Sequence, residues 1–136
     1  MAGWLGVVSA EHVRQAVALG IGQAGHGKRA PLARMHAGDL LLYYSPVERL
    51  GDGVPLRQFT AFGTVADDEI WQVEERGFQP YRRRVAYESV RPVGVDEVRN
   101  RLQLTAAPNW GYQLRRGVVP LADADVAVLR EAMLVA

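Results

Sequence analysis

Cysteine is absent from this 136-residue sequence, and Lys28 is its only lysine among 16 basic residues. Without cysteine the chain can form no disulfide, thiol nucleophile, thiolate zinc site or iron–sulfur cluster. Long apolar runs are also missing, since Leu40 to Tyr44 is far shorter than the ~20 residues of a membrane helix. The first residues carry no basic segment of a signal peptide. We therefore expect a soluble, cytoplasmic protein with no membrane partner.

Charge of one sign is missing as well. Sixteen basic and fifteen acidic residues leave a net charge of +1, which argues against a protein that coats nucleic acid through many phosphate contacts. One segment departs from this balance. Between Arg76 and Arg101 the chain holds seven arginines and three carboxylates, an excess of four positive charges centred on Arg82-Arg83-Arg84. This excess predicts a local basic patch.

Standard catalytic and nucleotide-binding motifs are absent too, including the Walker loop, Gly-x-Gly-x-x-Gly, His-Glu-x-x-His and Gly-x-Ser-x-Gly. The three histidines, His12, His26 and His36, stand fourteen and ten residues apart without a ligand pattern. We therefore expect no metal site, no cofactor and no self-sufficient catalytic centre.

What is present indicates one α+β domain over residues 1–136, because 49% of the residues are hydrophobic and no linker or repeat interrupts the chain. Short apolar and β-branched runs predict strands, with Gly63 at a bulge, and periodic apolar positions predict helices capped by Ser9 and Asp123. Four glycines between Gly20 and Gly27 predict a loop. The expected strands are 4–8, 40–45, 58–65, 71–73 and 80–87, and the expected helices are 10–19, 29–35, 95–102 and one from 123.

Aromatic and polar side chains gather where these strands begin or end. Trp4 opens the first strand, Tyr44 and Ser45 close the second, and Trp110 lies in a turn bounded by proline and glycine. Tryptophan and tyrosine offer a flat apolar face and a polar group, which suits a pocket for a planar ligand. In an extended strand Arg82 and Arg84 share one face while Arg83 takes the other, so at least one face meets solvent or a ligand.

An ordered set of short motifs over nearly the whole chain resembles the EVE domain of the PUA-like superfamily, in its small stand-alone prokaryotic branch. The motifs are Trp4-(x4)-Ser9, Gly25-His26-Gly27-Lys28, Arg34-Met35-(x2)-Gly38-Asp39, Tyr43-Tyr44-Ser45-Pro46, Phe59-Thr60-Ala61-Phe62-Gly63, Pro80-Tyr81 with the three arginines, and Trp110-Gly111. The resemblance implies a curved, mixed β-barrel of about five to six strands flanked by short helices. EVE domains are related to YTH domains, which read a methylated adenine in RNA.

The resemblance also implies a function: a non-enzymatic module that accepts a modified nucleobase of RNA or DNA in an aromatic and polar pocket. Each implied contact falls on a matching position. Trp4 and Trp110 would form walls, Ser9, Tyr44 and Ser45 would meet a base edge, and Phe59 and Thr60 would also contact the ligand. His26 and Lys28 would line the entrance, and Arg83 or its neighbours Arg82 and Arg84 would hold flanking phosphates.

Two other interpretations remain open at the level of sequence. Related ASCH domains include amidohydrolases that act on modified nucleosides with a lysine, a threonine and a glutamate. Lys28 and Thr60 match the first two, and Glu69 or Glu88 would have to be the third. The remaining interpretation is an interaction domain whose pocket is filled by its own side chains.

Overall fold

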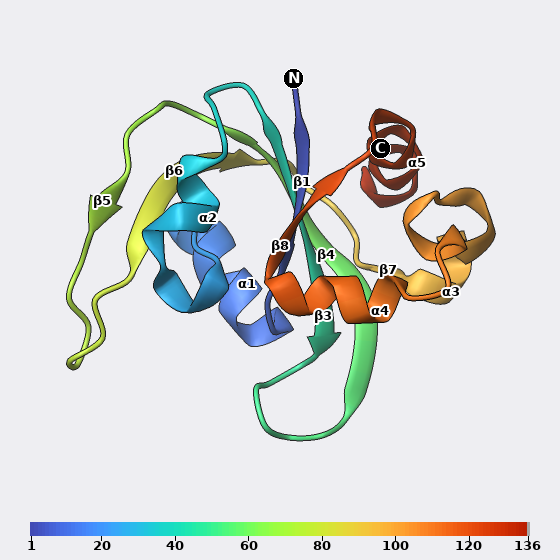
Figure 1. The fold of residues 1–136 in the computed structure, drawn as a ribbon, viewed down its shortest axis with the longest axis horizontal. Coiled ribbons are helices and arrows are strands. Elements are labelled where there is room, and N and C mark those ends of the chain that lie inside the picture. Colours follow the sequence, from blue (N-terminus) through green and yellow to red (C-terminus); the bar gives the residue numbers. More distant parts are fainter. Residues whose placement is uncertain (136) are drawn as a thin grey trace.

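The computed structural model describes residues 1–135, an α+β arrangement in which a curled sheet separates two groups of helices (Figure 1). The strands are β1 (Gly3–Val7), β2 (Ile21–Gly22), β3 (Leu40–Val47), β4 (Pro55–Val65), β5 (Trp71–Gln72), β6 (Tyr81–Tyr87), β7 (Val93–Gly94) and β8 (Val118–Leu121). The α-helices are α1 (Ala10–Leu19), α2 (Arg29–Ala33), α3 (Val95–Val98), α4 (Trp110–Gln113) and α5 (Asp123–Met133). Short 3₁₀ turns are η1 (Gly25–Gly27), η2 (Arg99–Arg101), η3 (Leu104–Ala106) and η4 (Leu114–Arg116).

The sheet runs in the order β2-β6-β4-β3-β1-β8, with β5 paired to β6 and β7 paired to β4. Only β1 and β3 are parallel neighbours in this order, and α1, β2 and α2 make the crossover between them. Every other pair along the path is antiparallel. The curled half-barrel of six strands confirms the expected fold class.

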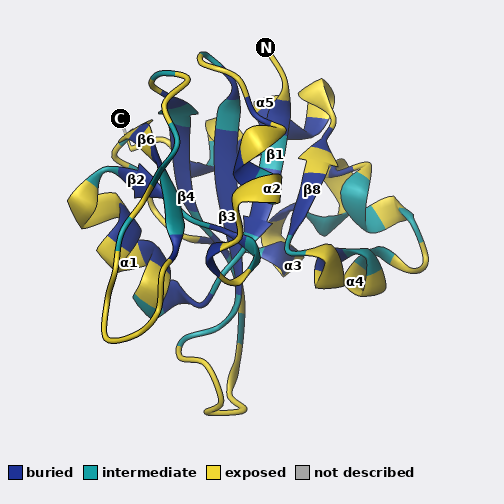
Figure 2. Cartoon of the chain, turned by 60° about the vertical axis from the view of Figure 1, so that its left-hand side comes forward, coloured by how far each residue is buried: buried dark blue, intermediate teal, exposed yellow. Residues whose placement is uncertain are grey.

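Each face of the sheet has its own apolar core. On one face α1 and α2 cover the sheet, and Val13 of α1 and Leu32 of α2 share a core with Tyr43 of β3. On the other face α3, α4 and α5 cover the sheet, and Leu129 of α5 shares a core with Phe59 of β4. Both faces of the central strands are therefore buried, whereas the tip of the connection between β3 and β4 protrudes into solvent (Figure 2). Burial on two sides explains why residues 40–45 are apolar at odd and even positions alike.

Three local expectations are corrected. The register shifts where Tyr43 faces Ala61 and Tyr44 faces Phe59, so the bulge of β4 lies at Thr60 and not at Gly63. Ser9 holds the N-cap position of α1, but its hydroxyl makes no capping hydrogen bond. Asp123 is the first residue of α5 and Ala122 is its N-cap. Polar residues at helix starts thus marked the boundaries correctly without supplying the expected caps.

Arg83 is 2% exposed and is the largest fully buried side chain among residues 1–135. It lies on β6 opposite Gly22 of β2. Its Nη1 donates to the carbonyl oxygens of Leu32 (3.0 Å) and Met35 (2.6 Å), and its Nη2 donates to that of Asp67 (2.5 Å). A buried guanidinium is tolerated because it donates to several buried carbonyl oxygens, of which that of Leu32 also accepts from the Met35 amide at 3.2 Å. Arg83 therefore ties α2 and the turn before β5 to the sheet.

We expect Arg83→Met to lower the free energy of unfolding by about 3–5 kcal/mol, because the buried carbonyl oxygens of Met35 and Asp67 would lose their donor and that of Leu32 would lose one of two. Arg84→Met is the matched control on the next residue. Its side chain is 52% exposed and pairs with Asp67 and Glu69, so its loss should lower stability by about 1 kcal/mol or less. Urea unfolding measures both values. Equal losses in the two variants would show that Arg83 has no special structural role.

Candidate functional site

The glycine-rich segment forms a left-handed turn. Gly25, His26 and Gly27 have φ values of 59°, 60° and 82° in succession. The amide of Gly27 donates to the carbonyl of Ala24 at 3.0 Å. A residue with a Cβ in this conformation is strained by roughly 1–2 kcal/mol, although histidine accepts it more often than most residues. The turn therefore presents the exposed His26 side chain in a conformation that the backbone alone would not select.

The buried Tyr43 and the half-buried Tyr87 fix the segment that leads into this turn. The Tyr43 hydroxyl donates to the Gln23 carbonyl at 2.9 Å and accepts from the Gln23 amide at 3.1 Å. The Tyr87 hydroxyl donates to the Ile21 carbonyl at 2.7 Å. Burial raises the pKa of both tyrosines, so both keep their protons and remain donors. The turn is thus anchored to the sheet on its N-terminal side.

Basic side chains surround the turn. A side chain added at Gly117 would lie 3.5 Å from the Gly25 Cα, so the end of η4 lies against the turn. Phe78 lies beside it as well, because a Cβ at Gly27 would come within 2.8 Å of the Phe78 ring. We call this region the basic surface and define it by exposed side chains on these two segments. Its members are His26, Lys28, Arg29, Arg115 and Arg116.

The cations of the basic surface have no carboxylate partner, whereas the arginines predicted to form a patch do. Within residues 1–135, Lys28, Arg29, Arg115 and Arg116 make no ion pair with a carboxylate. In the segment expected to be basic, all arginines but Arg76 pair with a carboxylate. The pairs join Arg82 to Glu75, Arg83 to Asp68, Arg84 to Asp67 and Glu69, Arg91 to Glu97, Arg99 to Asp96, and Arg101 to Glu131. The expectation of a patch at Arg82–Arg84 is therefore wrong, and the free positive charge lies elsewhere.

Several residues expected to contact the nucleic acid lie inside the protein. Tyr44, Ser45 and Phe59, expected at the base, and Arg83, expected at a phosphate, are between 0% and 3% exposed. The Ser45 hydroxyl hydrogen-bonds the Thr60 hydroxyl at 2.8 Å, and Tyr44 packs against Phe59 with ring centroids 5.2 Å apart. Their contacts with a base stay predictions that this burial does not favour. Ser9 is buried too, and its hydroxyl finds no hydrogen-bond partner in the described chain.

Each of the three tryptophans has an arginine over its ring. Arg34 lies 4.9 Å from the ring centroid of Trp4, whose Nε1 donates to Asp39 at 3.0 Å. Arg99 lies 5.7 Å from the Trp110 ring, which meets Tyr44 edge-on at 6.2 Å. The third pair is Arg84 over Trp71. The tryptophans expected to stack on a ligand are therefore already in cation–π contact with the protein.

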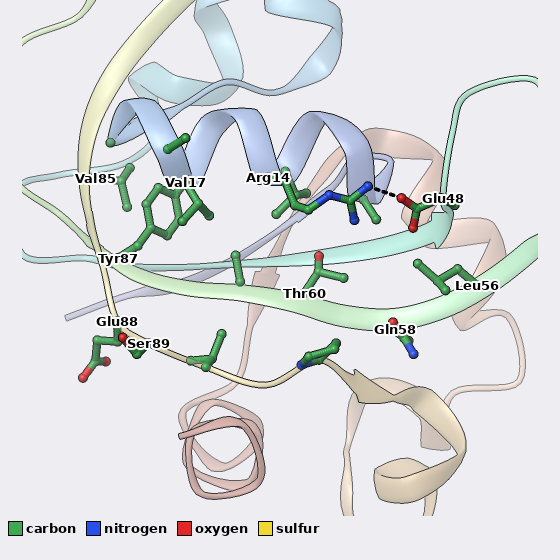
Figure 3. A pocket seen from close by; sticks show the side chains of 17 residues that line it. Arg14, Val17, Glu48, Leu56, Gln58, Thr60, Val85, Tyr87, Glu88 and Ser89 are labelled. Atoms are coloured by element: carbon green, nitrogen blue, oxygen red, sulfur yellow. Dashed lines mark hydrogen bonds and ion pairs between the residues drawn. The ribbon is translucent and has the colours of Figure 1, made fainter. Parts of the chain in front are cut away.

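Thr60 lines a groove of about 660 Å³ between α1 and β4, which is shown in Figure 3. None of the other residues predicted for the site lines this groove. The residues predicted for one pocket thus separate into the core, the groove and the basic surface, where His26 and Lys28 lie. Arg115 and Arg116 were missed in the sequence, although two arginines before a glycine are a visible signal.

No group of three or more His, Cys, Asp or Glu side chains is placed to hold a metal ion among residues 1–135. Over the same residues, no helix combines the length and the apolar character needed to cross a bilayer.

Comparison with known proteins gives a family and a fold. The sequence model of the EVE domain family matches residues 2–132 of this chain. A UPF0310 protein of Renibacterium salmoninarum is 50% identical over 130 residues, covering 96% of this chain and 94% of that protein. The UPF0310 protein YdcG of Bacillus subtilis is 37% identical over 132 residues, covering 96% and 90%.

Solved structures share this fold at low sequence identity. A hypothetical protein from Leishmania major has a TM-score of 0.61 at 14% identity, covering 97% of this chain and 94% of that one. The protein Atu2648 from Agrobacterium tumefaciens has a TM-score of 0.59 at 14% identity, covering 98% and 94%. These neighbours support the half-barrel architecture.

The Asp39 carboxylate accepts a hydrogen bond from Trp4, and its contribution to stability should depend on pH. Burial raises the pKa of Asp39, but hydrogen bonds from Trp4, His36 and Ala2 outweigh burial and lower it overall. A lowered pKa in the folded state means that Asp39 stabilises the fold above its unfolded pKa and loses this effect as the pH falls through the folded value. We expect Asp39→Asn to be about 1–2 kcal/mol less stable than the wild type at pH 6, with the gap narrowing towards pH 2. Thermal unfolding across this range measures it, and a gap independent of pH would contradict the assignment.

Proposed function

The chain belongs to the EVE domain family, and on that premise we propose that it is a non-enzymatic module that binds nucleic acid and accepts a modified base. The membership itself supports nucleic-acid binding, since the fold is PUA-like and the relatives carry no enzymatic name. The observation that carries the proposal further is the basic surface, where four cations without carboxylate partners surround a fixed left-handed turn.

The basic surface suits a few phosphates. Lys28 is a point charge, and Arg115 and Arg116 can each donate two parallel hydrogen bonds to a phosphate. With about four cations, the dependence of affinity on salt should be shallow, with a slope in log K against log salt of about −3 or smaller in magnitude. This matches a reader that holds a short stretch of backbone and not a protein that coats a long duplex.

Base recognition is assigned to the turn and to the aromatic ring beside it. His26 can donate or accept a hydrogen bond at a base edge, and its backbone conformation keeps it exposed. Phe78 is 45% exposed beside the turn and offers a ring for stacking. The segment α4–η4 begins at Trp110 and contributes Arg115, but Arg99 already lies over the Trp110 ring, so Phe78 is the stacking residue that we propose.

The alternative, an amidohydrolase, lacks its lysine. It needs Lys28, Thr60 and a glutamate around one substrate; Thr60 and Glu88 both line the groove, but Lys28 does not. Glu69 pairs with Arg84, and Glu88 with Arg130. We therefore do not propose this activity.

Replacing Lys28 by alanine should weaken binding to plain and modified oligonucleotides by the same factor and reduce the salt slope by about 1, because one phosphate contact is lost. Fluorescence anisotropy with short single-stranded RNA and DNA measures both quantities. Arg57→Ala is the control, since Arg57 is an exposed cation without an ion pair at the start of β4, outside the basic surface. Equal effects of the two substitutions would reject the basic surface as the binding site.

Replacing His26 by glycine should remove the imidazole while preserving the turn, because glycine adopts φ near +60° without strain. We expect unchanged or higher thermal stability together with a loss of preference for a modified over a plain base, by about tenfold for one hydrogen bond to the base. The measurement is the ratio of the two affinities across a panel of modified bases. A ratio that His26→Gly leaves intact would remove His26 from the base-binding site.

A further inference from the structure

The groove between α1 and β4 is a built cavity separate from the basic surface. Its 660 Å³ lie within the range of sites for small molecules. Figure 3 shows α1 along one side, with Arg14 and Val17, and Gln58 and Thr60 on β4. Tyr87 at the end of β6, with Glu88 and Ser89 after it, closes the other side. None of the residues that define the basic surface lines this groove.

Small residues create the space. Ala10 and Ala18 on α1, Gly20 at its C-terminus and Ala61 on β4 line the groove at positions where longer side chains would fill it. The bulge at Thr60 turns Thr60 and Ala61 to the same face of β4, which a regular strand would not do. The walls are mainly apolar, so a ligand here would bury its faces against hydrocarbon.

The polar groups on the β4 side suit an amide edge. The side-chain amide of Gln58 makes no hydrogen bond to residues 1–135, so its carbonyl and its NH₂ are both available. The Thr60 hydroxyl is bound once, to Ser45, and keeps capacity for a second hydrogen bond. A glutamine amide can donate and accept at the same time at the edge of a nucleobase.

The groove has no unpaired cation for a phosphate. One cation, Arg14, and two carboxylates, Glu48 and Glu88, line it. Arg14 is engaged by a hydrogen-bonded ion pair with Glu48, and Glu88 lies 3.7 Å from Arg130. A phosphate would therefore have to break an existing ion pair to find a cation, whereas an uncharged ligand disturbs neither pair.

We propose that this groove binds an uncharged nucleoside, with its base edge on Gln58 and its faces against the apolar walls, as a second site independent of the basic surface. The occupant is a free nucleoside and not a nucleotide, because the groove offers a phosphate no unpaired cation. The protein would then hold a nucleic-acid backbone at one place and a phosphate-free nucleoside at another.

The experiment compares four common nucleosides with their 5′-monophosphates by saturation-transfer NMR and calorimetry on the full chain. At least one nucleoside should bind with a dissociation constant of about 0.1 mM or tighter, and its monophosphate about tenfold more weakly. Absence of binding by all four, or equal binding of the monophosphate, would overturn the proposal.

Variants locate the binding. Ala18→Phe should block the groove and abolish nucleoside binding, because Ala18 lines the groove while remaining exposed, so that a ring fits without repacking the core. Leu19→Phe is the matched control, since Leu19 is 61% exposed on the next residue and does not line the groove. Gln58→Leu should weaken binding by about tenfold through the lost hydrogen bonds. Binding that survives Ala18→Phe, or that Leu19→Phe removes equally, would place the nucleoside elsewhere.

The two proposals fail separately. Ala18→Phe should leave oligonucleotide affinity unchanged, and Lys28→Ala should leave nucleoside affinity unchanged, because no residue of the basic surface lines the groove. If Lys28→Ala removes nucleoside binding, the second site does not exist. If nucleoside binding persists while no oligonucleotide binds, the proposed function is wrong, whereas the nucleoside site in the groove is retained.

Discussion

Three backbone carbonyls from two separate segments converge on the guanidinium of Arg83, and the position of the left-handed turn depends on that contact. Leu32 and Met35 follow the turn through α2, so binding their carbonyls fixes the turn on its C-terminal side. The hydroxyls of Tyr43 and Tyr87 fix it on its N-terminal side. A strained His26 persists only if its surroundings determine its conformation, and these buried donors supply that constraint.

The distribution of free charge follows from pairing and not from counts along the chain. Acidic residues of the turn before β5 take up Arg83 and Arg84, and carboxylates on or near helices take up Arg91, Arg99 and Arg101. Among the cations without a carboxylate partner, those of the basic surface stand at the glycine-rich turn and at η4, segments 86 or more residues apart in the sequence. A protein with a net charge of +1 can therefore present a basic surface without carrying a basic segment.

The fold was largely predictable because apolar runs and helical periodicity depend on neighbouring residues. The strand at 40–45 and the helix after Ser9 needed no knowledge of distant contacts. The role of Arg83 did need them, because alternation in a strand tells which residues share a face and not which face is covered. Arg115 and Arg116 were missed for the same reason, since their closeness to Gly25 arises only when the sheet curls.

The basic surface and the groove would bind their ligands through different interactions, although one sheet supports both. Phosphate binding requires unpaired cations in water, where salt weakens the attraction, whereas the groove offers apolar walls with its charges already paired. Gly20 joins the two, because it lines the groove, accepts a hydrogen bond from Val85 at 3.0 Å and begins the segment that leads to the turn. The short connection from α1 to β2 thus borders the groove and leads to His26, although no side chain belongs to both sites.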